Sequence, residues 1–386
     1  MNFINRRNTN SVKWDSVPED LLPLWVADMD FPSPPQVIEA LIKRAEHGVY
    51  GYTTIPDSYY DAVVNWMKKR HNWDIKKEWI IITPGVVAAL NYIIQTFTDL
   101  GDSVLVFQPV YNPFFNVVKN NERNLVIEPL VLKNGHYEID FVKLEESIIK
   151  NQVKLIILCS PHNPVGRVWT KTELTNIAET CLKHNVLIAV DEIHHDLIYK
   201  DYKHIPLASL KKEYSDICIT CTAPSKTFNL AGLYTSNVIV ENEELREKLR
   251  KFIKKLGGTH PSIFGMLACE VAYQTGEAWL EEVMTYIEEN KDYTMKFVED
   301  YLPLIHVIKP EATYLLWLDC RKLKLTDKEL LDFFMKEAKL YLNHGYVYGD
   351  EGSGFVRLNI ACHRSTLEQA LSRLKDAYDK RFTYKR

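Results

Sequence analysis

Cysteine is scarce in this chain: seven residues are spread thinly over 386 positions, and several of them lie inside apolar runs. An odd, scattered set excludes the disulfide framework of a small secreted domain and favours a reducing compartment. Long apolar runs are missing too, since no stretch approaches the about 20 residues that a membrane-spanning helix needs. The first eight residues lack the apolar segment of a secretory signal. We therefore expect a cytoplasmic protein without membrane contact.

A strong excess of one charge is absent as well. The chain has 47 Lys and Arg residues against 51 Asp and Glu residues, which gives a formal charge of -4. The basic stretches 68–70 and 250–255 stand among residues of mixed charge with a helical pattern, as on solvated helix faces. The sequence contains no internal repeat and no low-complexity segment. This composition argues against a nucleic-acid-binding protein.

Short apolar runs alternate with longer amphipathic segments between about residues 80 and 240. Several runs are nearly continuous in Val, Ile and Leu, which is typical of strands covered on both faces. The segment 170–185 has helical periodicity, with Thr170 as its expected cap and Glu173 three residues later. Strands that alternate with helices predict an α/β fold with a mostly parallel sheet flanked by helices. The strands are expected at 103–107, 125–132, 153–160, 186–190, 217–222 and 236–240.

The pattern changes after about residue 262. A long helical stretch runs to about residue 298, and strand-like segments follow at 313–318 and 355–360. We expect a large domain over 41–278. A smaller α+β domain, formed by 1–40 and 279–386, is expected beside it.

One lysine has unusual surroundings. Lys226 follows the apolar run 217–221 and precedes a stretch of small residues that ends at Gly232. A lysine among apolar and hydroxyl neighbours loses hydration, which disfavours the ammonium form and makes the neutral amine available as a nucleophile. A lysine after a strand is more often a solvated surface residue. The assignment therefore depends on the segments upstream.

The titratable cluster 191–196 follows the apolar run 186–190. Asp191 is thus expected at the carboxyl end of a buried strand, where open α/β sheets bind their ligands. His194, His195 and two carboxylates in this cluster are also suitable metal ligands. The sequence shows no HExxH spacing and no second His or Cys cluster that would complete a metal site. We therefore expect no metal ion.

Three further segments follow strand-like runs. Asn163 lies between two prolines, which would hold its backbone extended and aim its amide. Gly85 precedes a helix expected over 88–97, where free amides can bind an anion; a simple capped helix start is the alternative. Tyr111 follows the run 103–107 and by itself is an ordinary packing aromatic.

Together these segments offer an anion cradle, an aromatic ring, an amide donor, a carboxylate and a lysine, each after a successive strand and in that order. A flat, phosphorylated, cationic heterocycle attached to a lysine would use all five groups. Pyridoxal 5′-phosphate is such a molecule.

The order and spacing of these segments resemble the fold type I pyridoxal-phosphate enzymes of the aspartate aminotransferase group. Within that group, four segments resemble the cystathionine β-lyase branch, often called the MalY/PatB type. The resemblance spans nearly the whole chain and is more specific for the cofactor and the fold than for the substrate. The four segments are Trp25–Phe31, Tyr50–Tyr52, Ser160–Trp169 and Ser225–Asn229.

This resemblance implies roles around the cofactor ring. Lys226 would hold the cofactor covalently and, once freed by the substrate amine, remove the Cα proton. Asp191 would face the pyridine nitrogen; two unit charges about 3 Å apart, at an effective dielectric constant near 20, attract by roughly 5 kcal/mol and keep that nitrogen protonated. Asn163 would donate to the ring 3′-oxygen. Tyr111 would lie against the ring and donate its hydroxyl.

The same resemblance implies which groups hold the phosphate. They are the amides of Val86 and Val87, next to Gly85, and the hydroxyl of Ser225. Tyr52 resembles a tyrosine that reaches the phosphate across a dimer interface. A homodimer with shared sites is therefore implied.

On the substrate side, Arg357 resembles the arginine that binds the α-carboxylate through a bidentate pair. Ala27 and Asn163 are also expected beside the substrate. One position departs from the pattern: eight residues past Lys226, where many aminotransferases carry a phosphate-binding arginine, this chain has Tyr234. We find no candidate for a second carboxylate-binding arginine.

These features predict a pyridoxal-phosphate-dependent β-elimination of L-cystathionine or related S-substituted cysteines, which gives a thiol such as homocysteine, pyruvate and ammonia. Thiolates leave Cβ far better than alkoxides or carbanions, which favours sulfur substrates. An aminotransferase remains open, because both reactions use the same residues. A cofactor-binding regulatory or interaction protein with little turnover is a third alternative. Asp28, Asp30, His194 and His195 stay without a role; they either shape the entrance or stabilise the structure.

Overall fold

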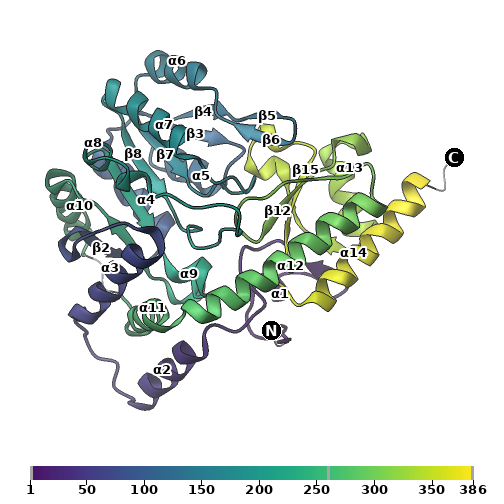
Figure 1. Ribbon diagram of the computed structural model, residues 1–386, viewed down its shortest axis with the longest axis horizontal. Coiled ribbons are helices and arrows are strands. Elements are labelled where there is room, and N and C mark those ends of the chain that lie inside the picture. Colours follow the sequence, from purple (N-terminus) through teal and green to yellow (C-terminus); the bar gives the residue numbers. More distant parts are fainter. Residues whose placement is uncertain (1–2, 259–260, 384–386) are drawn as a thin grey trace.

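The computed structural model describes residues 3–258 and 261–383. Its centre is a seven-stranded sheet with the strand order β2-β10-β9-β8-β7-β3-β4 (Figure 1). Strand β10 runs antiparallel to both of its neighbours, and the other adjacent pairs are parallel. The predicted α/β fold with a mostly parallel sheet is therefore confirmed. The strands are β2 (Ile80–Thr83), β3 (Ser103–Gln108), β4 (Asn124–Pro129), β7 (Val153–Cys159), β8 (Leu187–Asp191), β9 (Cys218–Thr222) and β10 (Ser236–Ile239).

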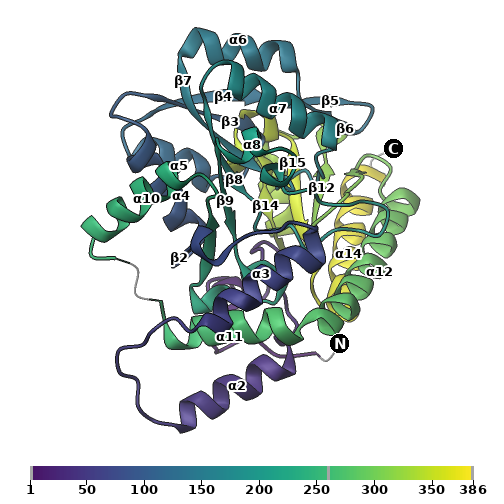
Figure 2. The ribbon, with the colours of Figure 1, turned by 60° about the vertical axis from the view of Figure 1, so that its left-hand side comes forward.

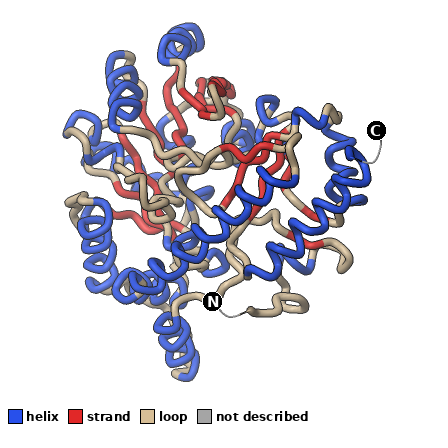
Figure 3. The backbone as a smooth tube through the Cα atoms, turned by 45° about the vertical axis from the view of Figure 1, so that its right-hand side comes forward, coloured by secondary structure: helices blue, strands red, loops and turns tan. Residues whose placement is uncertain are grey.

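Helices cover both faces of this sheet, so that the strands lie inside and the helices outside (Figure 3). Helices α4, α5 and α10 bury their apolar side chains against one face. Helices α3, α6, α7 and α11 belong to the larger apolar core on the other face. Cys218 and Cys221 on β9 fall in different cores, as expected for residues three apart in a strand. The bounds are α3 (Asp57–His71), α4 (Val86–Phe97), α5 (Pro113–Asn120), α6 (Phe141–Asn151), α7 (Lys171–Lys183), α10 (Glu243–Lys255) and α11 (Ile263–Thr275).

Most strands of the sheet begin and end within one residue of their predicted positions. The strand expected at 125–132 is different, because β4 ends at Pro129, which lacks the N–H needed to continue the ladder. The chain then forms a separate hairpin from β5 (Val131–Lys133) and β6 (His136–Glu138). Strand β2 was not predicted. At α7 the predicted cap is confirmed, since Thr170 and Glu173 form a capping box.

A second, four-stranded sheet lies in the C-terminal part, beside the long helices α12 (Glu277–Tyr301) and α14 (Arg364–Tyr378) (Figures 1 and 2). The helical stretch expected from 262 to 298 is broken into α11 and α12 at Gly276. A Cβ atom at Gly276 would lie 2.5 Å from the Phe228 ring, so the backbone passes too close for a larger residue. The strands, in sheet order, are β11 (His306–Ile308), β12 (Leu315–Asp319), β15 (Phe355–Asn359) and β14 (Asn343–His344).

The N-terminal residues contact this C-terminal part. Strand β1 (Leu22–Pro23) pairs in parallel with β13 (Leu340–Tyr341), whereas α2 (Pro35–Glu46) packs on α11 at the rim of the molecule (Figure 2). The division into a large domain over 41–278 and a small one from 1–40 and 279–386 stays a prediction. Within the described residues, no helix combines the length and apolar character that crossing a bilayer requires.

Candidate active site

Several strands of the large sheet end at one cavity. The loops after β3, β7, β8 and β9 line a cavity of about 750 Å³, and the segment 25–27 together with Arg357 of β15 closes it from the side of the smaller sheet. Such a crevice at the carboxyl ends of the strands is where open α/β sheets bind ligands. The predicted site residues that line the cavity are Ala27, Gly85, Val86, Val87, Tyr111, Asn163, Asp191, Ser225, Lys226 and Arg357.

Lys226 projects from the short helix α9 (Pro224–Thr227), which follows β9 directly. Its Nζ donates to the backbone oxygen of Ala27 at 2.6 Å, and no carboxylate of the described residues forms an ion pair with it. Burial and the charge of Arg357 lower the pKa of Lys226 to about 8, against the opposing charges of Asp28 and Asp191. About one amine in ten is then neutral at pH 7, far more than for an ordinary lysine. The structure thus holds a nucleophilic amine in the cavity.

Asp191 is the last residue of β8 and is buried. Its Oδ1 accepts a hydrogen bond from the backbone N–H of Ile193 at 3.0 Å. Burial raises the pKa of Asp191 to about 7, while the Ile193 bond and the charge of Lys226 oppose the shift. A cationic group in the cavity would offset this desolvation and keep the carboxylate ionised. A protonated pyridine nitrogen is such a group.

Arg357 and Asn163 are held together at the cavity wall. The Arg357 guanidinium donates to Asn163 Oδ1 at 3.0 Å and to the backbone oxygen of Trp25 at 2.7 Å, and it lies over the Tyr348 ring. Arg357 is buried, yet its Nε has no hydrogen-bond partner among the described residues. A buried cation without a carboxylate partner fits a ligand that carries one. The bond from Arg357 also fixes the amide of Asn163 with its oxygen engaged, so the nitrogen remains as the donor for a ligand.

The start of α4 is suited to an anion. Gly85 precedes the helix, no described side chain caps it, and a Cβ atom at Gly85 would meet no atom within 4 Å. The free amides of Val86 and Val87 and the positive end of the helix dipole therefore face open space in the cavity wall. Ser225 lines the same cavity, and Tyr234, at the position of the missing arginine, stands there largely exposed. This arrangement fits a phosphate held without an arginine.

The two predicted tyrosines are placed differently. Tyr111 stands between β3 and α5 at the cavity wall, where burial raises the pKa of its hydroxyl and Arg357 opposes the rise. Tyr52 lies outside this cavity; its side chain is fully exposed and lines a separate hollow of about 680 Å³. Tyr111 therefore joins the site within this chain. Tyr52 does not.

Several residues of the site escaped prediction. Tyr314 donates its hydroxyl to the backbone oxygen of Ala27 at 2.9 Å, the same oxygen that Lys226 contacts. Asn343 donates to the backbone oxygen of Trp25 at 3.1 Å and lines the cavity. Asn359 donates to the backbone oxygens of Val26 and Asp28, at 2.6 and 2.7 Å. Their partners are backbone carbonyls, which leave no signature in a sequence motif.

The acidic residues left unassigned have a structural role. Asp30 accepts bonds from Lys13, Arg6 and the Trp14 indole at 2.8, 2.8 and 2.9 Å. Asp28 forms an ion pair with Arg6 at 2.7 Å. The two carboxylates thus anchor the N-terminal residues, which is the structural alternative considered for them.

The two unassigned histidines face different surroundings. His194 lines the cavity next to Asp191, and burial together with the charges of Lys226 and Arg357 lowers its pKa well below the usual range. A neutral His194 imidazole therefore forms part of the cavity wall. His195 is buried on another side, against His71 and Asp196.

The chain is similar to known proteins over nearly its full length. Residues 19–374 match the family Aminotransferase class I and II. The chain is 44% identical to the cystathionine beta-lyase PatB of Bacillus subtilis (strain 168), with 98% of this chain and 100% of PatB covered. It is 33% identical to the protein MalY of Escherichia coli (strain K12), with 97% of each chain covered.

A solved structure has the same fold. Cystalysin from Treponema denticola, whose crystal structure contains a pyridoxal 5′-phosphate cofactor, superimposes with a TM-score of 0.95 at 41% identity, and 98% of each chain is covered. The resemblance noted in the sequence is thereby confirmed. The chain belongs to the aminotransferase class I and II family, in the branch that includes PatB and MalY.

Proposed function

We propose that this protein is a pyridoxal-phosphate-dependent carbon-sulfur β-lyase that acts on L-cystathionine or related S-substituted cysteines. One observation carries the proposal: a single cavity holds an amine without a carboxylate partner, a buried acid and a buried guanidinium, namely Lys226, Asp191 and Arg357. These groups match the aldehyde, the ring nitrogen and the amino-acid carboxylate that the reaction has to hold. Relatives with cystathionine β-lyase names support the same assignment.

The residues of the chain have separate roles in this reaction. The cofactor, when bound, supplies an electron sink for the pair released at Cα. Arg357 holds the substrate carboxylate and thereby orients the Cα–H bond. The neutral Nζ of Lys226 takes the Cα proton. The Cβ–S bond then breaks, the thiolate leaves with the bonding pair and is protonated, and water converts the three-carbon fragment to pyruvate and ammonia.

The cavity favours elimination over transamination of dicarboxylic amino acids. Among the described lining residues, Arg357 is the single arginine, so one substrate carboxylate is recognised and not two. Trp25, Tyr111 and Val347 present apolar surface where a thioether side chain would lie. An aminotransferase of another amino acid is the competing function, and it would use the same lysine.

The test measures products. Purified protein with L-cystathionine should release pyruvate, ammonia and homocysteine in equal amounts, and the Lys226→Ala variant serves as the matched control. L-Serine, with a poor leaving group at Cβ, should react far more slowly than an S-alkylcysteine of similar size. Steady turnover with a keto-acid acceptor and no pyruvate from cystathionine would overturn the proposal in favour of an aminotransferase.

We further propose a homodimer in which Tyr52 reaches the phosphate site of the partner. Tyr52 and its exposed neighbours Val49 and Tyr50 form an apolar surface, which supports burial against a second copy. Mixing Lys226→Ala and Tyr52→Phe subunits tests this arrangement. If Tyr52 acts across the interface, the mixed dimer has one intact site and regains activity that both parents lack. If Tyr52 acts within its own chain, no intact site forms and the mixture stays inactive.

A cytoplasmic location is proposed on the state of the cysteines. All seven are free and buried, as suits a reducing compartment. Fractionation of cells that make the protein would test this location.

A further inference from the structure

Residues at and just after the end of β8 line two different places. Asp191, Ile193 and His194 line the cofactor cavity. Glu192 and His195 instead meet His204, which comes from the loop before residues 207–209. One ligand atom from each of the three lies within 4.8 Å of the other two. The second histidine missing from the sequence motif is thus supplied nine residues further along the chain.

All three side chains are buried and incompletely hydrogen-bonded. Their exposed fractions are 0% for Glu192, 1% for His195 and 4% for His204. Glu192 Oε1 accepts from the N–H of Leu207 at 3.2 Å. Glu192 Oε2 and both ring nitrogens of each histidine make no aligned hydrogen bond among the described residues, although His195 Nε2 lies 3.2 Å from Asp196 Oδ2. Leaving such groups unpaired costs about 1–3 kcal/mol each, so this cluster is suited to an additional partner.

One separation in the cluster matches that between two ligands of a metal ion. His204 Nε2 lies 3.2 Å from Glu192 Oε2, yet the two are not aligned as a hydrogen bond. Ligand atoms at about 2.0–2.1 Å around a tetrahedral zinc ion are roughly 3.3 Å apart. Two imidazoles and one carboxylate are also a ligand set that zinc and similar ions use, with a fourth position left for water.

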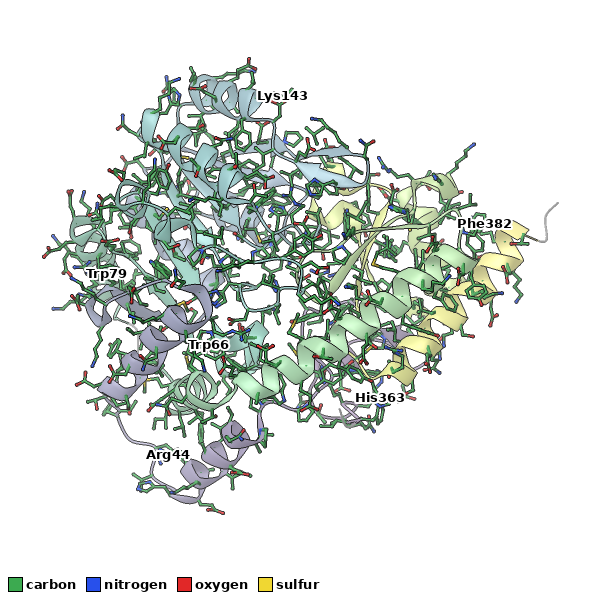
Figure 4. All side chains as sticks on the ribbon, viewed as in Figure 1. Arg44, Trp66, Trp79, Lys143, His363 and Phe382 are labelled. Carbon is green, nitrogen blue, oxygen red and sulfur yellow. The ribbon has the colours of Figure 1, made fainter. Side chains whose placement is uncertain are left out.

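A second trio, His71, His195 and Asp196, shares His195 with this one, but its carboxylate already has several hydrogen-bond partners. Asp196 accepts from His71 Nε2 at 2.9 Å, from Thr227 Oγ1 at 2.7 Å and from the Trp66 indole at 3.1 Å; Trp66 is labelled in Figure 4. His71 stacks on the His195 ring at 4.2 Å. These residues would therefore orient the His195 ring from behind, as outer partners of metal-binding histidines do.

The cluster can be reached from solvent. His195 and His204 line a cavity of about 300 Å³. The cations at its rim are largely compensated or solvated: Lys69 and Arg70 form ion pairs with Glu277, and Lys200 and Lys203 are exposed. The cluster itself offers one carboxylate and two imidazoles, a ligand set that suits a divalent cation and not an anion.

We propose that Glu192, His195 and His204 bind one divalent transition-metal ion of the zinc class. The ion ties the end of β8, next to Asp191, to the loop that carries His204. Through His195, Asp196 and Thr227 the site is also connected to the helix that carries Lys226.

The experiment uses the cofactor-loaded full chain, stripped with a chelator and titrated with Zn²⁺ and with Co²⁺. We expect one ion per chain by elemental analysis, a melting temperature that rises with zinc, and the intense visible bands of tetrahedral cobalt without a sulfur-to-cobalt charge-transfer band. Glu192→Gln keeps the acceptor for Leu207 and removes the metal-binding oxygen, and His204→Asn removes a ring. Both should weaken binding at least tenfold, whereas the exposed-histidine control His306→Ala should bind like the parent.

Three results would overturn the proposal. They are no stoichiometric binding, equal binding by the parent and Glu192→Gln, or a thiolate charge-transfer band that assigns the ion to cysteine. The cobalt spectrum needs only the parent protein, so the proposal stays testable even if His204→Asn does not fold.

Discussion

Two lysines of this protein, the buried Lys13 and the partly buried Lys226, are paired in opposite ways. Lys13 is fully buried, and its Nζ forms ion pairs with Asp30 at 2.8 Å and Asp28 at 3.8 Å. Lys226 has a backbone carbonyl as its partner, and burial beside Arg357 lowers its pKa to about 8. The first amine is fixed between two carboxylates. The second is partly neutral and free to react.

The comparison of these two lysines shows which surroundings make a lysine nucleophilic. A buried ammonium that keeps its carboxylates is stabilised by them and serves the structure. A buried ammonium that lacks them releases its proton more easily, and a neighbouring guanidinium strengthens the effect. The acids near Lys226 are still present, but Asp28 is engaged with Arg6, and Asp191 carries a raised pKa. The Lys226 amine therefore has little negative charge nearby to stabilise its ammonium form.

The largest effect is expected at Lys226. Replacing it by Ala should lower pyruvate release from cystathionine by about 10⁴-fold or more, since both the covalent attachment and the proton transfer are lost. Steady-state assays with saturating cofactor measure this loss. Lys226→Arg keeps a cation but no nucleophilic amine and should be similarly inactive. Activity above a tenth of the parent in either variant would contradict the role.

The next effect concerns stability and not turnover. Lys13→Met removes one of the two cations paired with the buried Asp30, which keeps Arg6, and should lower the free energy of unfolding by about 1–3 kcal/mol. Urea denaturation measures it, with pyruvate release per folded molecule as the second readout. Adding Asp30→Asn to Lys13→Met should recover part of the loss. A Lys13→Met protein as stable as the parent would break the contrast between the two lysines.

A smaller effect is expected at Arg357. Arg357→Lys keeps the charge but loses the fork that contacts Asn163 and Trp25, so kcat/KM for cystathionine should fall by about 100-fold. Initial rates over a range of substrate concentrations separate kcat from KM. Because the neighbouring Lys226 then faces a more mobile cation, its pKa should also change. An Arg357→Lys variant with parental kcat/KM would remove Arg357 from substrate binding.

The smallest effect is a pH dependence. Only the neutral amine reacts with an acylating reagent, and the neutral fraction grows as pH rises towards and past the pKa. With a pKa of about 8, labelling of Lys226 in the cofactor-free protein should rise about tenfold from pH 7 to pH 9; at the ordinary value of 10.5 the rise would be about 100-fold. Mass spectrometry of the labelled peptides measures both lysines. Lys13 should stay unlabelled in the folded protein.

Although β2 was not predicted, the sequence was sufficient for five of the seven strands of the large sheet, because these are nearly continuous apolar runs. It missed the turn from β4 into the β5–β6 hairpin at Pro129 and the break between α11 and α12 at Gly276. The first has a local cause that was visible in the sequence, the missing N–H of Pro129. The second depends on packing contacts distant in sequence, because the backbone at Gly276 passes against Phe228. Such contacts have no local pattern.

The site residues likewise fall into those that the sequence identified and those that it did not. Lys226, Asp191 and Asn163 follow strand ends in order, so position along the chain was enough to find them. Tyr314 and Asn343 act on backbone carbonyls of segment 25–27, and His204 meets Glu192 only after the loop folds back. These residues could not be found from spacing, because their partners are set by tertiary structure.

The most direct test of the account is the identity of the lysine that holds the cofactor. The protein is incubated with pyridoxal 5′-phosphate and reduced with borohydride, while the absorbance at about 420 nm is followed. It is then digested and analysed by mass spectrometry. We predict that the absorbance is lost on reduction and that the pyridoxyl group is found on the peptide containing Lys226. Modification at Lys13 or at surface lysines, with Lys226 unmodified, would contradict the central claim.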